Sequence, residues 1–323
     1  MNTYIKRNIN IELLRIISML LIVIYHYQAR EFGLYVIGND QLGEPQLLPE
    51  LILHSLGKLG VPIFVFISGY YGIKFKGKRL LELIIMTFFY ALLSVLVYDI
   101  IYGAFNIKNL LIFTNHWWFI TAYICLYLLS DGINYVIEKI SKWQLLTIVA
   151  IFYFISFGDL IVNSANIGGL YIMFTMYLSA RWIKLYFTET MQKYCWMLFP
   201  VLLFCRISII FCGYHFHHLG VLPYINSYVN PLTMITAASL FYCFLKIKEC
   251  HYKKIIQWFS SSALAVYLFS EGPCGQKLFA PLFPEKNNWN LILFLFGSII
   301  TYVIIACIDK IRIMILNKLI TKN

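Results

Sequence analysis

The sequence predicts an all-α polytopic membrane protein with about ten transmembrane helices, and three observations carry this prediction. Of its 323 residues, 60% are hydrophobic and only 13% are charged, whereas about a quarter of a soluble domain is charged. The mean hydropathy is +0.73, and apolar runs of roughly 20 residues, the length of a helix that crosses a bilayer, recur along the chain. The runs are continuous rather than alternating, which excludes an outer-membrane β-barrel.

Ten apolar segments are expected to cross the membrane, and no stretch between them has the composition of a separate soluble domain. Residues 1–323 are therefore expected to form one membrane domain without a fused soluble domain. The ninth segment is the shortest and can begin earlier, near Ile255. The expected spans are 10–29, 56–73, 80–103, 117–133, 143–161, 167–183, 195–213, 229–245, 258–271 and 290–308.

The distribution of positive charge orients these spans. With the N-terminus in the cytoplasm, 19 of the 26 lysines and arginines fall in cytoplasmic segments and 4 in outer loops. The other three, Arg15, Lys58 and Arg206, lie inside spans. Cytoplasmic loops of membrane proteins carry such an excess of positive charge. Both termini are therefore expected in the cytoplasm, and the net charge of +11 reflects topology rather than binding to nucleic acid.

The first span carries three ionisable residues on one side. Arg15 and His26 are eleven residues apart, about three helical turns, so they share a face and lie about 16 Å apart along the axis. Glu12 precedes Arg15 by three positions and can neutralise it. Because an ionisable group in a bilayer costs a few kcal/mol, this helix is expected to face a polar interior. The alternative is that Arg15 snorkels to the headgroups and His26 lies at the opposite interface.

The long polar stretch after this span, residues 30–55, is expected to be an outer loop. It can bind a polar substrate through its carboxylates, or it can be a solvated connector. Its ionisable residues are Glu31, Asp40, Glu44, Glu50 and His54.

A basic run follows the second span. The small pair Ser68-Gly69 near the end of that span allows another backbone to come close, as in ordinary helix packing. The run itself can hold a phosphate-rich ligand, or it can serve orientation and contact with lipid headgroups. It comprises Lys74, Lys76, Lys78 and Arg79.

Later polar residues give weaker signals. Trp117 and Trp118 fit an interfacial aromatic belt. Arg206 lies midway through its span and needs a carboxylate, a carbonyl or a ligand phosphate as partner. Three histidines at 215, 217 and 218 have no nearby carboxylate and two are adjacent, so no metal site is expected. The eight cysteines are scattered without a C-x-x-C motif and are expected to be small core residues.

Several motifs resemble the acyltransferase-3 family of integral membrane acyltransferases, and the resemblance covers nearly the whole chain. Arg15 and His26 match a basic-x10-His motif, and GVPIFVFISGYYG resembles the family's Gly-Val-x-x-Phe run that ends in Ser-Gly. Lys76-Gly77-Lys78-Arg79 is similar to the family's R-x-x-R. WWFITAYICLYLL and SSSALAVYLFS resemble its Trp-Phe helix and its S-x-x-x-Y-L motif.

The chain also departs from the family pattern in two places. A histidine often follows the family's Tyr-Leu pair, where this chain has Phe269-Ser270-Glu271. A proline commonly follows the Trp-Phe helix, where this chain has Ser130-Asp131-Gly132. The role of the first position in particular cannot be carried over from the family.

The resemblance implies an O-acyltransferase of a bacterial-type inner membrane, which moves acetyl from acetyl-CoA to a cell-surface or lipid-linked glycan. Acetyl-CoA, or another acyl-CoA, is then a co-substrate, and no tightly bound cofactor is expected. The acceptor hydroxyl needs a base, and histidine titrates near neutral pH. His26 is therefore expected to be the general base or a transient acyl carrier, two roles that the sequence does not separate.

The other expected site residues surround this step. The phosphates of the donor are expected at Arg15, Lys76, Arg79 and Arg206, and Arg15 is expected to be a catalytic residue together with His26. Ser68 and Tyr267 are candidate lining or oxyanion-stabilising groups, and Glu12, Trp118 and Glu271 are candidate lining residues. Two other classes of function stay open: a glycan transporter, flippase or polymerase without acyl chemistry, and a sensor that binds ligand without turnover.

Overall fold

The computed structural model describes residues 8–31, 33–34, 37, 39, 42–43, 46–103, 106–111, 117–162, 169–272, 274–285 and 290–320. Every regular element in these residues is a helix. The first half contains α1 (Ile9–Glu31), α2 (Leu47–Gly57), α3 (Gly60–Tyr71), α4 (Gly77–Tyr102), η2 (Ile107–Leu110), α5 (Trp118–Lys139) and α6 (Lys142–Val162). The second half contains α7 (Gly169–Tyr186), α8 (Glu189–Tyr194), η4 (Cys195–Met197), α9 (Leu198–His215), η5 (Leu219–Val221), α10 (Leu222–Ile225), α11 (Pro231–Lys246), α12 (Lys253–Ser260), α13 (Ala263–Ser270), α14 (Gly275–Phe279), η6 (Ala280–Leu282) and α15 (Leu291–Ile320).

Several of these helices are long and apolar enough to cross a bilayer, so the chain is a multi-pass membrane protein. Two shorter apolar helices, Lys142–Ser156 and Pro231–Lys246, fall below the length used for a full span. The count of ten spans and the cytoplasmic placement of both termini therefore stay predictions. Within the described residues the six candidate spans are Ile9–Arg30, Leu47–Tyr71, Gly77–Tyr102, Trp118–Lys139, Glu189–His215 and Leu291–Ile315.

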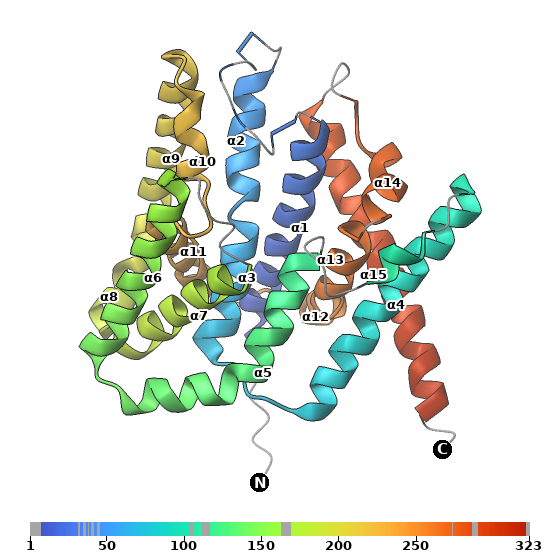
Figure 1. The fold of residues 1–323 in the computed structure, drawn as a ribbon, viewed down its shortest axis with the longest axis horizontal. Helices are drawn as coiled ribbons and strands as arrows, with labels where there is room; N and C mark the ends of the chain where they lie inside the picture. Colours follow the sequence, from blue (N-terminus) through green and yellow to red (C-terminus); the bar gives the residue numbers. More distant parts are fainter. Residues whose placement is uncertain are drawn as a thin grey trace.

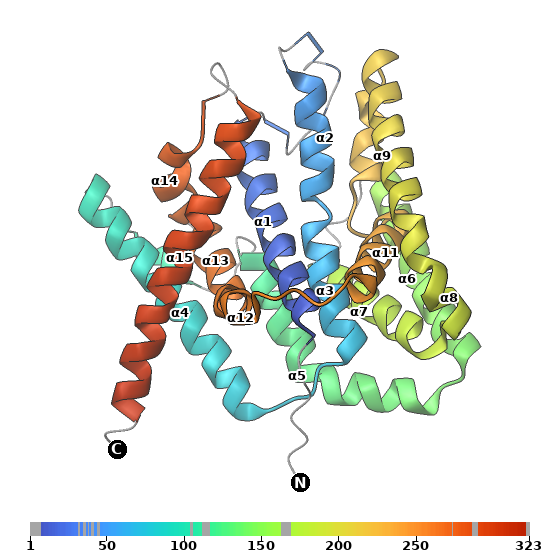
Figure 2. The ribbon, with the colours of Figure 1, turned by 180° about the vertical axis from the view of Figure 1, so that it is seen from behind.

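Helix α1 is the centre of the molecule. It packs against α2, α3, α11, α12, α13 and α15, and it lies between α2 on one side and α13 to α15 on the other (Figures 1 and 2). Its apolar residues Leu14, Met19 and Val23 have no exposed surface, as expected of a helix that is hydrophobic nearly all round. Arg15 and His26, on its polar face, are partly exposed.

The second span begins earlier than predicted. Glu50 and His54, expected in an outer loop, lie within α2 and are buried. Pro49 sits in the first turn of α2, where a missing N–H is tolerated. Glu50 and His54 are one turn apart and so share a face, which turns both polar side chains toward the interior of the bundle. Asp40 and Glu44 lie outside the described residues, as does the side chain of Glu31.

A break at Lys58 and Leu59 separates α2 from α3. A Cβ atom on Gly57 would lie 2.7 Å from Tyr25 Cβ, and one on Gly60 would lie 2.6 Å from the Ser18 carbonyl oxygen. Only glycine allows α1 to approach so closely at both positions. Lys58 is therefore held at the depth of residues 18–25 of α1, in the middle of the bundle.

The predicted span 258–271 is not one helix. The chain turns at Ser261-Ser262 between α12 and α13. Serine side chains compete for backbone hydrogen bonds and favour turns over helix interiors. The expectation of a single ninth span is therefore wrong within the described residues, and α13 alone presents the Tyr-Leu motif to the centre.

Candidate functional site

His26 lies against a carboxylate from the far end of the sequence. The His26 Nδ1 atom is 3.3 Å from Glu271 Oε2, and the side chains are 18% and 3% exposed. Glu271 directly follows α13 and is oriented by two further donors. The Ser270 hydroxyl donates to Oε1 at 3.1 Å, and the Gln276 amide donates to Oε2 at 3.0 Å. A histidine held in this way by a carboxylate is suited to accept a proton from a hydroxyl group.

The turn that carries Glu271 is fixed directly on α1. The Arg30 guanidinium donates to the Gln276 carbonyl at 2.7 Å, and the Tyr27 hydroxyl donates to the Gly275 carbonyl at 3.4 Å. A Cβ atom at Gly275 would overlap the Phe269 carbonyl oxygen, so this tight turn requires glycine. The geometry of the His26–Glu271 pair is therefore set by contacts of this turn with the part of α1 that follows His26.

Aromatic side chains from α5 and α13 surround the pair. The Tyr267 ring packs edge-on against Phe119 at 5.1 Å, and its hydroxyl lies near Glu271. Trp117 is fully buried and would contact a Cβ atom at Gly272 at 3.1 Å. Within the described residues its indole N–H has no hydrogen-bond partner. A buried donor without a partner beside the Glu271 turn is available to a substrate oxygen.

Trp118 lies on another side of the site. Its ring stacks on Tyr228, with the centroids 5.9 Å apart, and both side chains are partly exposed. This tryptophan is therefore part of an aromatic surface rather than of the His26–Glu271 pair.

The other end of the polar face of α1 carries Arg15. Its guanidinium forms the expected ion pair with Glu12 at 3.1 Å, and 29% of its side chain is exposed. The hydroxyl of Tyr123 lies near Arg15 and Ser68, and Tyr71 also lies near Arg15. Arg15 thus has tyrosine and serine hydroxyls around it, and part of its side chain is exposed.

The basic run beyond α3 has an anchored backbone and free side chains. Lys74, Lys76, Lys78 and Arg79 are exposed, while residues 73–76 between α3 and α4 are bound to side chains of α5 and α7. The bonds join Ile73 N–H to the Tyr177 hydroxyl (3.2 Å), Asn134 Nδ2 to the Ile73 carbonyl (2.7 Å), Phe75 N–H to Asp131 Oδ1 (3.0 Å), Lys76 N–H to the Tyr127 hydroxyl (3.1 Å) and the Tyr177 hydroxyl to Asn134 Oδ1 (2.9 Å).

Arg206 lies elsewhere. It is 1% exposed, and its guanidinium donates to Ser55 Oγ at 2.5 Å, Asn226 Oδ1 at 3.0 Å and Thr233 Oγ1 at 3.2 Å. These partners lie on α2, after α10 and on α11, whereas Arg15 pairs with Glu12 on α1 and the basic run is bound to α5 and α7. The structure thus separates Arg206 from the other cations that the sequence grouped as donor ligands.

Sequence reasoning missed the partners that position the basic run. Tyr127, Asp131 and Asn134 recur on one side of α5 at spacings of four and three residues, a helical signal that could have identified a polar face. Asp131, where the chain departs from the family pattern, therefore helps to hold the backbone of the basic run in place. Glu271 was expected as a lining residue only, because nothing in the sequence shows that it meets His26.

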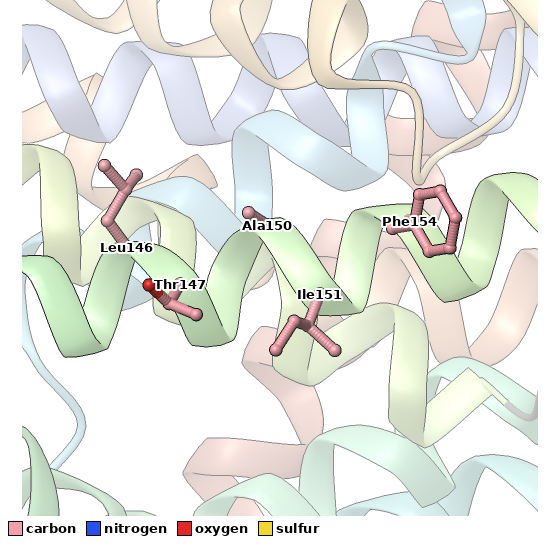
Figure 3. A pocket seen from close by; sticks show the side chains of 5 residues that line it. All are labelled: Leu146, Thr147, Ala150, Ile151 and Phe154. Carbon is pink, nitrogen blue, oxygen red and sulfur yellow. The ribbon is translucent and has the colours of Figure 1, made fainter.

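A hollow on α6 does not contribute to this site. An apolar hollow of about 490 Å³ lies on α6, lined by Leu146, Thr147, Ala150, Ile151 and Phe154 (Figure 3). Ile151 and Phe154 are exposed, as expected on a lipid-facing side. In the part of the chain that the structure describes, His, Cys, Asp and Glu side chains form no group of three that could hold a metal.

Comparisons with known proteins identify the family of the chain. The family model of the acyltransferase domain, Acyl_transf_3, matches residues 8–310. No curated protein matches the chain, and no solved structure matches it. The matched range contains α1, the basic run and the turn that carries Glu271.

Proposed function

Because the chain belongs to the acyltransferase-3 family, we propose that it is an O-acyltransferase that moves acetyl from cytoplasmic acetyl-CoA to a hydroxyl of a cell-surface or lipid-linked glycan. Family membership and the long apolar helices support a membrane acyltransferase. The single observation that supports the site is the pair of His26 and Glu271. Its histidine lies on the same face of α1 as Arg15.

In the proposed reaction His26 acts on the acceptor. Glu271 holds Nδ1, so Nε2 is the ring nitrogen that takes the proton from the acceptor hydroxyl. The hydroxyl oxygen then attacks the thioester carbonyl carbon, the C–S bond breaks, and the thiolate of coenzyme A leaves with the proton. The ester and free coenzyme A are the products. In the alternative order, acetyl moves first to Nε2 and then to the acceptor.

The donor is proposed to enter from the basic run. Arg15, Lys76 and Arg79 are cations of the type that binds phosphate, and Ser68 and Tyr123 line the path beside Arg15. The distance of about 16 Å along α1 between Arg15 and His26 allows a thioester arm to reach the histidine while the phosphates stay at the mouth. The Trp117 indole N–H and the Tyr267 hydroxyl are candidate donors to the thioester oxygen.

The O-acetyl content of surface glycans tests this proposal. It is measured by proton NMR in cells that carry the wild type, His26→Ala, the control His251→Ala or no copy of the gene, with membrane levels checked by blot. His251 is exposed and lies beside α12, away from the pair. Loss of acetyl in His26→Ala and the deletion, but not in the control, supports the proposal.

A second assay separates transfer from transport. Release of coenzyme A from acetyl-CoA is followed with purified protein in nanodiscs, with and without a glycan acceptor. A transporter, flippase or polymerase releases none, and a sensor binds acetyl-CoA without turnover. Either result would contradict the proposed function.

A further inference from the structure

A second line of polar side chains runs beside His26 and takes no part in the proposed reaction. Glu50, His54 and Lys58 are each four residues apart on or just after α2, so they share one face. That face meets α1: the Gln28 amide donates to Glu50 Oε2 at 2.5 Å, and the His54 ring lies 5.0 Å from the Tyr25 ring. This line therefore reaches the depth of the catalytic pair.

Lys58 ends the line between two aromatic rings. Its ammonium nitrogen lies 4.2 Å from the Tyr25 ring centroid and 4.7 Å from that of Tyr228. Trp118 in turn stacks on Tyr228. Aromatic faces attract a cation, but they carry no net charge and leave the charge of Lys58 uncompensated.

Arg206 adds a second cation to the same place. Its guanidinium donates to Ser55, three residues before Lys58 along the chain, and its partners Ser55, Asn226 and Thr233 are all neutral. In the described residues neither cation forms an ion pair. The carboxylate of the line, Glu50, is two turns from Lys58 and bonded to Gln28.

Two like charges without a counter-ion, one buried and one partly exposed, are unfavourable in an apolar interior. A bound anion offsets this cost through its attraction to both cations. Lys58 is partly exposed, so an anion can reach it, whereas Arg206 is buried behind it. We propose that Lys58, with Arg206 behind it, is an anion-binding subsite for the acceptor, and that the acceptor sugar carries a phosphate or a carboxylate group.

The position of Lys58 fits an acceptor that bridges to His26. The Tyr25 ring contacts both: its centroid is 4.8 Å from that of the His26 ring and 4.2 Å from the Lys58 ammonium. An anionic group on Lys58 thus lies about one sugar residue away from a hydroxyl at His26. The partly exposed rings of Tyr228 and Trp118 offer an apolar face for the sugar itself.

This inference rests on the proposed function for its meaning, but binding tests it without any acyl transfer. The dissociation constants of glucose 1-phosphate, glucuronate and glucose are measured by titration calorimetry with purified protein in nanodiscs. The wild type is expected to bind at least one charged sugar about tenfold more tightly than glucose. The two charged probes distinguish a phosphate from a carboxylate as the source of the anion.

Variants locate the binding. Lys58→Met and Lys58→Gln are expected to lose this preference, and Lys58→Arg is expected to keep it. Lys277→Met is the matched control, because Lys277 is an exposed lysine whose ammonium also lies over a tyrosine ring, 5.4 Å from Tyr98. Thermal unfolding of each variant without ligand confirms that it is folded.

Two results would overturn the inference: equal binding of all three sugars by the wild type, or an unchanged preference in the folded Lys58→Met and Lys58→Gln variants. Its failure is separate from failure of the proposed function. If the protein releases coenzyme A but does not prefer charged sugars, the anion-binding subsite is wrong and the proposed acyl transfer stands. If charged sugars bind at Lys58 but no coenzyme A is released, the subsite stands and the proposed acyl transfer is wrong.

Discussion

The two ends of α1 hold their charged side chains in different ways. At the Arg15 end the cations are open: 29% of the Arg15 side chain is exposed, and Lys76 and Arg79 are exposed on a run whose backbone is bound to α5 and α7. At the His26 end the charge is enclosed, because Glu271 is 3% exposed and receives hydrogen bonds from Ser270 and Gln276.

This difference matches two different tasks. Exposed cations can bind a highly charged ligand from water without a large change in their own burial. A histidine held by a buried carboxylate is aligned before the substrate arrives, and it acts where low polarity strengthens each electrostatic contact. Under the proposed function, the Arg15 end binds the donor and the His26 end transfers the proton. Four predictions test this division.

The largest expected effect is all-or-none and concerns which end faces the cytoplasm. Lys108 lies on η2, next to Asn109, whose amide contacts Cys274 near the Glu271 turn. In intact cells Lys108→Cys should react with a membrane-impermeant maleimide, whereas Lys76→Cys should react only after permeabilisation. The parent chain, with its own exposed cysteines, gives the baseline. The reverse pattern would invert the orientation predicted from loop charge.

Glu271→Gln should lower kcat by about 10² to 10⁴, because an amide no longer holds the histidine tautomer or stabilises its charged form. The KM for acetyl-CoA should stay within about twofold, since Glu271 lies at the far end of α1 from Arg15 and is expected to contribute to the chemical step rather than to donor binding. Initial rates of coenzyme A release measure both constants.

Glu285→Gln is the matched control, because Glu285 is exposed and is expected to keep wild-type rates. A Glu271→Gln variant with normal kcat and a raised KM for the acceptor would make Glu271 a substrate ligand rather than the partner of His26.

Arg15→Ala should raise the KM for acetyl-CoA by about 10- to 100-fold, the effect of removing a hydrogen bond to a charged group worth ~1.5–3 kcal/mol. It should change kcat less, because His26 and Glu271 remain in place. Arg15→Lys should fall between, and Lys248→Ala, an exposed cation on the segment between α11 and α12, should behave as wild type. Unchanged donor kinetics in Arg15→Ala would remove Arg15 from donor binding.

Much of the fold could be predicted from hydrophobic runs. The predictions that failed have a physical cause. The helices fall on the predicted apolar segments, but the second span begins at Leu47 because Glu50 and His54 lie inside a helix. A hydropathy pattern assigns such residues to a loop. The hydropathy pattern does not show that two polar side chains one turn apart can both face a polar interior.

The site residues also divide into those that could be predicted from the sequence and those that could not. The common face of Arg15 and His26 and the pair with Glu12 follow from helical periodicity, which is a local property. The contact between His26 and Glu271 depends on how α13 packs on α1, and the sequence carries no local sign of it. The same holds for Asp131, whose partner Phe75 belongs to another helix connection. Tertiary contacts of this kind decide which predicted residues act together.

The smallest expected effect concerns the backbone of the basic run. Tyr127→Phe removes the acceptor of the Lys76 N–H, and Asp131→Ala removes that of the Phe75 N–H. Each lost bond is worth ~0.5–1.5 kcal/mol, so each variant should raise the KM for acetyl-CoA by roughly 2- to 10-fold without a matching loss of kcat. Tyr135→Phe, an exposed position on the same helix, should have no effect. If the anchoring variants instead lower kcat and leave the donor KM unchanged, the basic run would be coupled to the His26 end, and the division of tasks along α1 would fail.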